Sequence, residues 1–297
     1  MLNVLSVDVE EGFHATEVCR SIQREQWLDL PSCVVGQTAR VLEIFDRQAV
    51  RATFFVLGWV AHRHPRLVRA IAERGHEIGC HSQDHRLIYD LSPGQFREDT
   101  REACRRIEDA CGQRPRVYRA PSYSITRRSL WAFETLVELG FTHDSSVYPV
   151  SHDRYGIPGF RRHAHIIITP SGPIWEAPVA SVMLPSGRVA PVGGGAYLRL
   201  LPYRYTAAGI RRINEKDGHP ACVYFHPWEI DPDQPRLARG AVSRLRTYTG
   251  LPKMARKVER LIQEFRFAAL SDVYPLSAGC EQTIATNQQQ FAAGSPS

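Results

Sequence analysis

Two histidines and a group of acidic residues are the features of this sequence whose types and spacing could do chemistry. His81 and His85 are four residues apart, so on a helical turn both imidazoles point the same way, as zinc ligation requires. The chain holds twelve histidines in 297 residues, so the spacing also fits an incidental surface pair. The pair therefore indicates a metal site only if a third ligand accompanies it.

Acidic residues at the end of the first predicted strand supply candidates for that ligand. The strand runs from Leu2 to Val9 and continues into Glu10 and Glu11. Strand alternation sends Asp8 and Glu10 to one face and Val9 to the other. Two carboxylates on one face repel each other unless a cation or hydrogen bonds compensate, although Glu10 and Glu11 also fit solvated loop acids. Two histidines and one carboxylate leave an open position for water on a zinc-like ion, as in catalytic sites.

Further polar groups follow other predicted strands. Arg119-Ala120-Pro121-Ser122-Tyr123 comes after one strand, His226-Pro227-Trp228-Glu229 comes after another, and Asp144 closes a third. Parallel sheets place functional groups where their strands finish. On such a rim, Arg119 could orient a carboxylate base, and His226 could donate a proton while Asp144 keeps it charged.

The hydrophobic pattern predicts the elements that position these groups. Apolar runs predict strands at 2–9, 52–56, 76–80, 117–119, from 141, 165–169, 174–177 and 221–225, with helices between most of them. The helix after Ser92 has a serine cap, an early proline and Gln95 at its third position, and another is expected from about Arg127 to Gly140. This alternation predicts an α/β fold with a parallel sheet, open or closed into a barrel. Gly193-Gly194-Gly195 lacks the lysine and the helix of a phosphate loop, so we expect a tight loop there.

Composition sets the class of protein. Hydrophobic residues make up 43% and charged residues 23%, which are ordinary values for a globular protein, and the net charge of +6 permits an anionic partner without requiring one. No apolar run is long enough for a membrane helix, and a strand begins where an export signal would stand, so we expect a cytoplasmic protein. Seven cysteines without C-x-x-C spacing favour a reducing compartment. The scattered arginines match no nucleic-acid-binding module, so no nucleic-acid partner is expected.

At these motifs the sequence resembles the polysaccharide deacetylases, the NodB-homology carbohydrate esterases of family 4. The resemblance is carried by Arg51-Ala52-Thr53-Phe54-Phe55-Val56-Leu57-Gly58, by residues 74–85 and by the motif from Arg119 to Tyr123. The segments 193–203 and 225–229 resemble the subfamily encoded beside exosortase (PEP-CTERM) exopolysaccharide loci. The family implies a distorted (β/α) barrel with parallel strands in a single domain. We expect that domain at 1–276, its subfamily-specific part at about 150–276, and a disordered tail at 277–297.

The resemblance also implies an activity, which is metal-dependent removal of N-acetyl groups from amino sugars of an exopolysaccharide or its precursor. A divalent metal, with zinc as the expected ion, would be held by Glu10, His81 and His85. Asp8, positioned by Arg119, would act as general base, and His226, kept charged by Asp144, as general acid. The backbone N–H of Tyr123 would stabilise the oxyanion.

One departure from the family pattern concerns the metal ligand. Most members carry two adjacent aspartates after the first strand, the second a ligand, whereas Val9 stands at that position here. A branch of the family has an acid-x-acid arrangement, so we carry the ligand role over to Glu10, with Glu11 and His14 as substitutes.

The expected substrate is an N-acetylated polysaccharide or oligosaccharide, with Trp228, Pro121 and Tyr148 as candidate contacts for its sugar rings. A peripheral contact with a membrane-bound exopolysaccharide assembly system is also considered. Two alternatives stay open. One is a hydrolase of small amides or cyclic imides on the same fold, and the other is an inactive partner in exopolysaccharide assembly, suggested by Val9.

Overall fold

The computed structural model describes residues 1–19, 22–152 and 154–276. The predicted disordered tail at 277–297 lies outside the described residues. Among the helices of the described residues, none has both the length and the hydrophobicity needed to span a membrane.

A mostly parallel sheet of nine strands forms the centre of the molecule, in the order β10-β1-β2-β3-β4-β5-β7-β6, with β11 beside the start of β1. Only the β6 and β7 pair is antiparallel within it. Its strands are β1 (Leu2–Val9), β2 (Thr53–Val56), β3 (Glu77–Cys80), β4 (Val117–Tyr118), β5 (His143–Asp144), β6 (His165–Thr169), β7 (Gly172–Glu176), β10 (Cys222–Phe225) and β11 (Arg266–Ala268). A separate antiparallel hairpin pairs β8 (Ser181–Met183) with β9 (Val189–Pro191).

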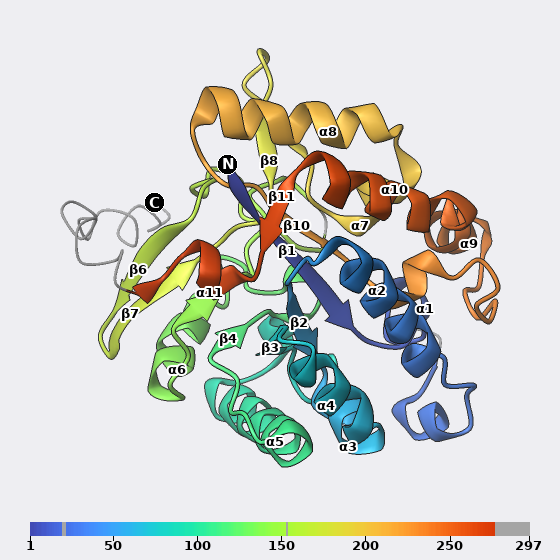
Figure 1. The fold of residues 1–297 in the computed structure, drawn as a ribbon. Helices are drawn as coiled ribbons and strands as arrows, with labels where there is room; N and C mark the ends of the chain where they lie inside the picture. Colours follow the sequence, from blue (N-terminus) through green and yellow to red (C-terminus); the bar gives the residue numbers. More distant parts are fainter. Residues whose placement is uncertain (20–21, 153, 277–297) are drawn as a thin grey trace.

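Helices lie around this sheet, with α2 to the right of β1 in Figure 1, α3 to α6 below it, and α8 and α10 above it. They are α1 (Thr16–Cys19), α2 (Val34–Gln48), α3 (Gly58–Arg63), α4 (Pro65–Glu73), α5 (Pro93–Cys111), α6 (Ala132–Glu138), α7 (Gly195–Leu200), α8 (Tyr203–Arg212), α9 (Ala241–Tyr248), α10 (Leu251–Glu264) and α11 (Leu270–Val273). The predicted α/β class with a parallel sheet is confirmed.

Backbone hydrogen bonds outside the strand ladders link β5 to β10 and give the sheet its barrel-like character. After β7, Ala177 N–H donates to Asp144 O at 2.9 Å, and Ala180 N–H donates to Cys222 O at 2.9 Å. Tyr224 N–H donates to Gly193 O at 2.8 Å. The segment between β7 and α7, which also contains β8 and β9, therefore bridges the end of β5 and strand β10 without adding a strand to the main sheet.

Local sequence signals explain where several elements begin. Ser92 Oγ accepts Gln95 N–H at 3.3 Å while Gln95 Oε1 accepts Ser92 N–H at 2.9 Å, so the predicted capping box opens α5. The helix expected from Arg127 begins only at Ala132, because Ser129 N–H and Oγ bond back to Thr126 and Ser124 in a turn.

The tight loop expected at the glycine triplet is only partly correct, because Gly195 begins helix α7. A Cβ on Gly195 would lie 2.0 Å from Glu229 Oε2, and one on Gly193 would lie 2.3 Å from Cys222 O. The glycines are thus required by the close approach of this helix to β10 and Glu229, a long-range contact that the local pattern does not carry.

Candidate active site

Asp8, at the end of β1, is held by one buried arginine. Arg119 Nη1 donates to Asp8 Oδ1 at 2.8 Å and to Ser6 Oγ at 2.7 Å, and its other donors bond to Ser145. Its guanidinium also lies 4.2 Å from the ring centre of Phe55. Both Asp8 and Arg119 are buried, so this ion pair is rigid, and Asp8 Oδ2 is left toward the cavity.

Glu10, His81 and His85 place their ligand atoms within 4.8 Å of one another, and all three are buried. Glu10 Oε2 lies 3.0 Å from His85 Nε2 and 4.0 Å from His81 Nε2. His81 Nδ1 is 2.8 Å from Arg119 O, and because a carbonyl only accepts, the proton is on Nδ1 and Nε2 has a free lone pair. Burial lowers the pKa of His81 to about 4, which keeps its imidazole neutral.

These three residues fit a divalent metal. Glu10 Oε2 is buried and accepts no hydrogen bond from the described residues, although it faces two imidazole nitrogens. Burial would raise the pKa of Glu10, but the neighbouring histidines outweigh it and hold the pKa well below its usual range. A buried carboxylate oxygen with two imidazole nitrogens is the donor set of a catalytic zinc site.

The segment that carries the two histidines is not a helical turn, which corrects the sequence argument. Ser82 and His85 both have positive φ, of 67° and 55°, and residues 81–87 form an irregular loop. The His81 and His85 rings still come within 5.5 Å of each other. The left-handed residues turn the loop back toward β1, so the spacing predicted the correct pair for a different geometric reason.

His226 follows β10, and its partner is Glu229. His226 Nδ1 donates to Glu229 Oε2 at 3.0 Å, while its Nε2 lies 3.9 Å from Asp8 Oδ2 and 3.6 Å from Glu10 Oε1. Glu229 is itself held by Arg199 Nε at 3.1 Å. Burial alone would lower the pKa of His226, but Glu10, Glu229 and Asp8 outweigh it and raise the pKa to about 9.

The prediction that Asp144 keeps His226 charged is therefore wrong. In the described chain Asp144 accepts from Ser146 N–H at 2.9 Å and Ser146 Oγ at 2.6 Å. It lies opposite Glu176 in the β5 and β7 register, and both carboxyls are fully buried. Ser146 Oγ in turn accepts Ala120 N–H at 2.8 Å, so Asp144 supports the loop beside Arg119 rather than the acid. The sequence prediction missed Glu229. A local signal for it was present, because Glu229 is an acidic residue three positions after the helix cap His226.

Glu11 and His14, the substitute ligands, have other partners. Glu11 Oε2 accepts the N–H groups of Cys33 and Val34, at 3.0 and 3.2 Å, at the start of α2. His14 Nδ1 accepts Glu11 N–H at 3.1 Å, so the proton of the neutral ring is on Nε2, which then has no lone pair for a metal. Burial lowers the pKa of His14 to about 3 and keeps the ring neutral.

The oxyanion and sugar contacts inferred from the resemblance are only partly placed as expected. Tyr123 N–H already donates to Ala120 O at 3.1 Å, which makes it unavailable as the oxyanion donor in this conformation. Pro121 and Tyr148 are buried and are not among the described residues that line the cavity. Trp228 does line the cavity, but its ring stacks on His226 at 5.0 Å and its Nε1–H donates to Glu10 Oε1 at 3.2 Å. It thus supports the metal ligand and the acid.

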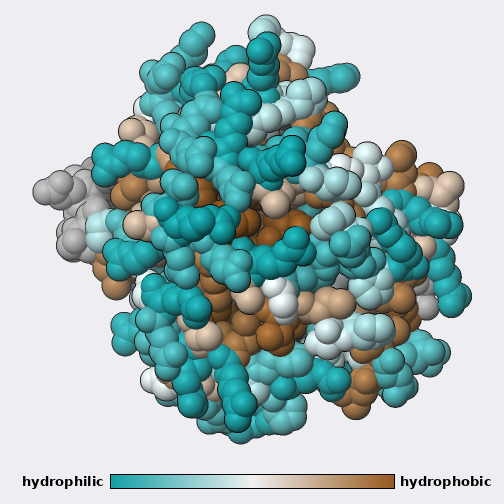
Figure 2. All heavy atoms as spheres, turned by 45° about the vertical axis from the view of Figure 1, so that its right-hand side comes forward, coloured by the Kyte–Doolittle hydropathy of each residue, from teal (hydrophilic) through white to brown (hydrophobic). Residues whose placement is uncertain are grey.

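Asp8, His226 and the candidate metal ligands Glu10, His81 and His85 all line one cavity of about 340 Å³. Its remaining wall includes tyrosines from several loops and strands, namely Tyr89, Tyr123, Tyr155, Tyr197 and Tyr224. The face of the molecule in Figure 2 is mainly hydrophilic, with apolar side chains visible in hollows near its middle. The volume is at the low end of the range of about 300–1,000 Å³ for small-molecule pockets, which suits a short segment of a glycan or a small amide.

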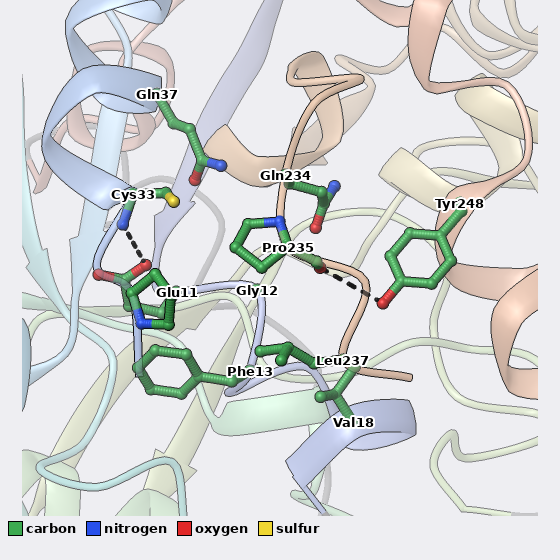
Figure 3. A pocket seen from close by; sticks show the side chains of 11 residues that line it. Glu11, Gly12, Phe13, Val18, Cys33, Gln37, Gln234, Pro235, Leu237 and Tyr248 are labelled. Carbon is green, nitrogen blue, oxygen red and sulfur yellow. Dashed lines mark hydrogen bonds between the residues drawn. The ribbon is translucent and has the colours of Figure 1, made fainter. Parts of the chain in front are cut away.

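A second cavity, shown in Figure 3, lies beside Glu11 and is lined also by Gly12, Gln234 and Tyr248. It measures about 10 Å³, room for no more than one water molecule. It therefore carries no substrate site.

Comparisons with known proteins give a family model for each half of the chain. A model for polysaccharide deacetylases matches residues 29–142, and a model for a domain of unknown function, DUF3473, matches residues 145–275. The first match includes His81, His85 and Arg119, and the second includes His226 and Glu229. Asp8 and Glu10 precede both.

Individual relatives are similar over part of the chain or in fold. A chitooligosaccharide deacetylase from Bradyrhizobium sp. (strain ANU 289) is 33% identical over 121 residues, which are 40% of this chain and 54% of the relative. A structure from Mycobacterium smegmatis assigned as a polysaccharide deacetylase covers 96% of this chain and 93% of its own, with a TM-score of 0.67 and 20% identity. A structure from Pseudomonas aeruginosa PAO1 with the same assignment covers 92% of this chain and 89% of its own, with a TM-score of 0.61 and 19% identity. The alignment thus spans about half the length of the curated relative, and the two structures show the fold.

Proposed function

Because residues 29–142 match the model for polysaccharide deacetylases and residues 145–275 match the DUF3473 model, we propose that the chain is a polysaccharide deacetylase, a metal-dependent hydrolase of N-acetyl groups on amino sugars. The observation that carries the proposal is the arrangement of charges in the cavity. Asp8, a base held by Arg119, and His226, an acid held by Glu229, lie next to each other beside the ligand set of Glu10, His81 and His85, with His226 Nε2 3.9 Å from Asp8 Oδ2.

The metal site supplies the first part of the chemistry. Glu10, His81 and His85 would hold the ion, which when bound polarises the acetamide carbonyl and lowers the pKa of water. Each histidine presents its Nε2 toward Glu10 Oε2, and the Nδ1–H of His81 is fixed by Arg119 O. The site thus needs little rearrangement to bind an ion, which favours affinity.

Asp8 and His226 supply the proton transfers. Arg119 occupies Asp8 Oδ1, so Asp8 Oδ2 is the atom that takes a proton from the attacking water. His226 Nε2–H, on the same side of the cavity, then protonates the leaving amine as the C–N bond breaks. A depressed Glu10 pKa and a raised His226 pKa keep the ligand anionic and the acid charged at neutral pH. The products are acetate and a free amino sugar.

The proposal is tested by measuring acetate release from N-acetylglucosamine oligomers before and after chelation. We expect turnover that is lost with the metal and restored by adding zinc or another divalent ion. Turnover that is unchanged after complete metal removal would contradict the proposed chemistry.

Hydrolysis of a small amide or a cyclic imide is the competing proposal, favoured by the modest cavity volume and by Glu10 after Val9. Faster hydrolysis of small imides than of the acetylated sugars would replace our substrate with that class. An inactive role would instead show as a purified protein without an equivalent of bound metal and without turnover of either substrate.

An exopolysaccharide or its precursor is our proposed natural substrate, and a cytoplasmic site of action is part of the same proposal. Both rest on the resemblance of residues 193–203 and 225–229 to the exosortase-locus subfamily. Deletion of the gene should then leave the exopolysaccharide fully acetylated.

A further inference from the structure

One stretch of the sequence carries only positive charge. Residues 234–258, which we call the basic segment, contain seven cations and no acidic residue, whereas the whole chain has 37 basic and 31 acidic residues. The cations are Arg236, Arg239, Arg244, Arg246, Lys253, Arg256 and Lys257. This composition is a separate observation from the motifs of the cavity.

Helix α9 lies within the basic segment and exposes aliphatic side chains. Val242 and Leu245 are each 63% exposed, and their spacing of three residues places them on one face of the helix. Arg244, between them in sequence, is also exposed. The one side chain that α9 buries is Thr247. A helix that keeps its aliphatic residues outside and buries a threonine has its apolar face turned away from the core.

Four cations of the basic segment are exposed without an acidic partner among the described residues. Within the described part of the chain, Arg239, Arg244, Lys253 and Arg256 are exposed and take part in no ion pair. On α5, by contrast, Arg101 pairs with Glu98 and Arg105 pairs with Glu102. The charges of Arg239, Arg244, Lys253 and Arg256 are therefore available to an outside anion.

The position of α9 connects this surface to the active site. Arg246 and Thr247 of α9 and Leu200 of α7 line the same cavity as Asp8 and His226. Figure 1 shows α9 at the outer edge of the molecule, beside the start of α10. Whatever binds α9 would therefore meet the mouth of the cavity.

We propose that α9 and its flanking cations bind the surface of an anionic phospholipid membrane. Val242 and Leu245 enter the boundary between headgroups and acyl chains, and Arg239 and Arg244 contact the phosphates. Exposed aliphatic residues beside unpaired cations fit lipid better than nucleic acid, which single-strand binders engage through aromatic stacking. Because Arg246 and Thr247 of the same helix line the cavity, the cavity would then lie close to the membrane surface.

The test is co-sedimentation of the full chain with vesicles of phosphatidylcholine alone or mixed with phosphatidylglycerol. We expect binding to the mixed vesicles only, weakened by salt. Arg244→Gln should lower the partition coefficient about fivefold, because one cation near an anionic surface contributes about 1 kcal/mol to membrane binding. The double variant Val242→Ser with Leu245→Ser should lower it roughly tenfold or more.

Matched controls keep the test independent of folding and of catalysis. Val35→Ser removes an aliphatic side chain that is 44% exposed on α2, and Arg101→Gln removes a paired cation on α5. Both should bind vesicles as the unaltered chain does, and all variants should keep its thermal midpoint. Failure to bind mixed vesicles at low salt would overturn the proposal, as would equal binding by the Val242 and Leu245 variant. Binding to an acidic polymer without binding to vesicles would also overturn it. Because the experiment measures vesicle binding, its result does not depend on whether the protein has deacetylase activity.

Discussion

At the scale of single residues, the site is built from pairs in which one side chain fixes another. Arg119 fixes Asp8, Glu229 fixes His226, and Trp228 contacts both Glu10 and His226. As the proposed ligand, Glu10 is longer than the aspartate of the family pattern, and the Trp228 N–H restrains its extra freedom. We propose that Trp228 is a positioning residue for Glu10.

Replacing Trp228 by phenylalanine tests that role. Trp228→Phe keeps an aromatic face over His226 but removes the N–H that holds Glu10 Oε1. We expect zinc affinity to fall about 10- to 100-fold, the usual effect of losing a hydrogen bond to a metal ligand. Zinc titration against a competing chelator measures it, and Trp175→Phe, a buried tryptophan stacked on Tyr274, is the control. Equal zinc affinity in the two variants would remove Trp228 from this role.

The buried carboxyl pair of Asp144 and Glu176 makes a second prediction. Burial raises the pKa of Glu176 well above 4.5, and Asp144 raises it further. A folded-state pKa above the unfolded value gives stability that is complete below about pH 4.5 and is lost as the pH rises through the folded pKa. Glu176→Gln mimics the neutral acid, so its free energy of unfolding should decline less with rising pH.

Urea unfolding from about pH 5 to about pH 9 measures this difference. Glu98→Gln, an exposed glutamate on α5, should keep the pH dependence of the unaltered chain. If Glu176→Gln kept it too, Glu176 would not be protonated in the folded protein.

At the scale of secondary structure elements, Glu11 ties the end of β1 to helix α2. Its carboxylate accepts hydrogen bonds from two N–H groups at the first turn of α2 and from the Ser32 hydroxyl. Glu11→Ala leaves those buried donors unpaired and should cost about 2 kcal/mol of folding free energy. Glu11→Gln should cost less, because burial already raises the pKa of Glu11 and the amide oxygen can still accept.

Urea unfolding of both variants measures the cost, and a zinc titration completes the test. Because Glu11 is bound to α2, neither variant should lose the equivalent of metal. Loss of metal in Glu11→Gln at unchanged stability would make Glu11 the ligand in place of Glu10.

The elements show which parts of the site could be predicted from sequence. The period of two in β1 was sufficient to place Asp8 and Glu10 toward the cavity and Val9 in the core, and the capping box located α5. The loop at 81–87 was missed because its left-handed residues, Ser82 and His85, are not glycines. The partner of His226 was misassigned because several acids follow strands, and only packing decides which one reaches the imidazole. Helix α7 depends on the contact between Gly195 and Glu229, which no local pattern contains.

At the scale of the whole molecule, the two matched regions build one cavity. Residues 29–142 supply His81 and His85, residues 145–275 supply His226, Trp228 and Arg199, and the end of β1 with the residue after it supplies Asp8 and Glu10. Arg119, which holds Asp8, also lies within residues 29–142. β1 pairs with β2 on one side and β10 on the other, so it joins the two regions in a single sheet. Neither matched region alone contains a base, an acid and a full ligand set.

The central claim is that one cavity holds a metal and a separate general base, and Asp8→Asn tests it most directly. The asparagine keeps the shape of Asp8 and leaves Glu10, His81 and His85 in place, so the variant should bind metal as the unaltered chain does. Its rate of acetate release from N-acetylglucosamine oligomers should fall by about 10²- to 10⁴-fold, which is the usual contribution of general-base catalysis to a rate. Retained metal with lost turnover is the predicted result. Full turnover in Asp8→Asn, or turnover lost only because metal is lost, would contradict the account.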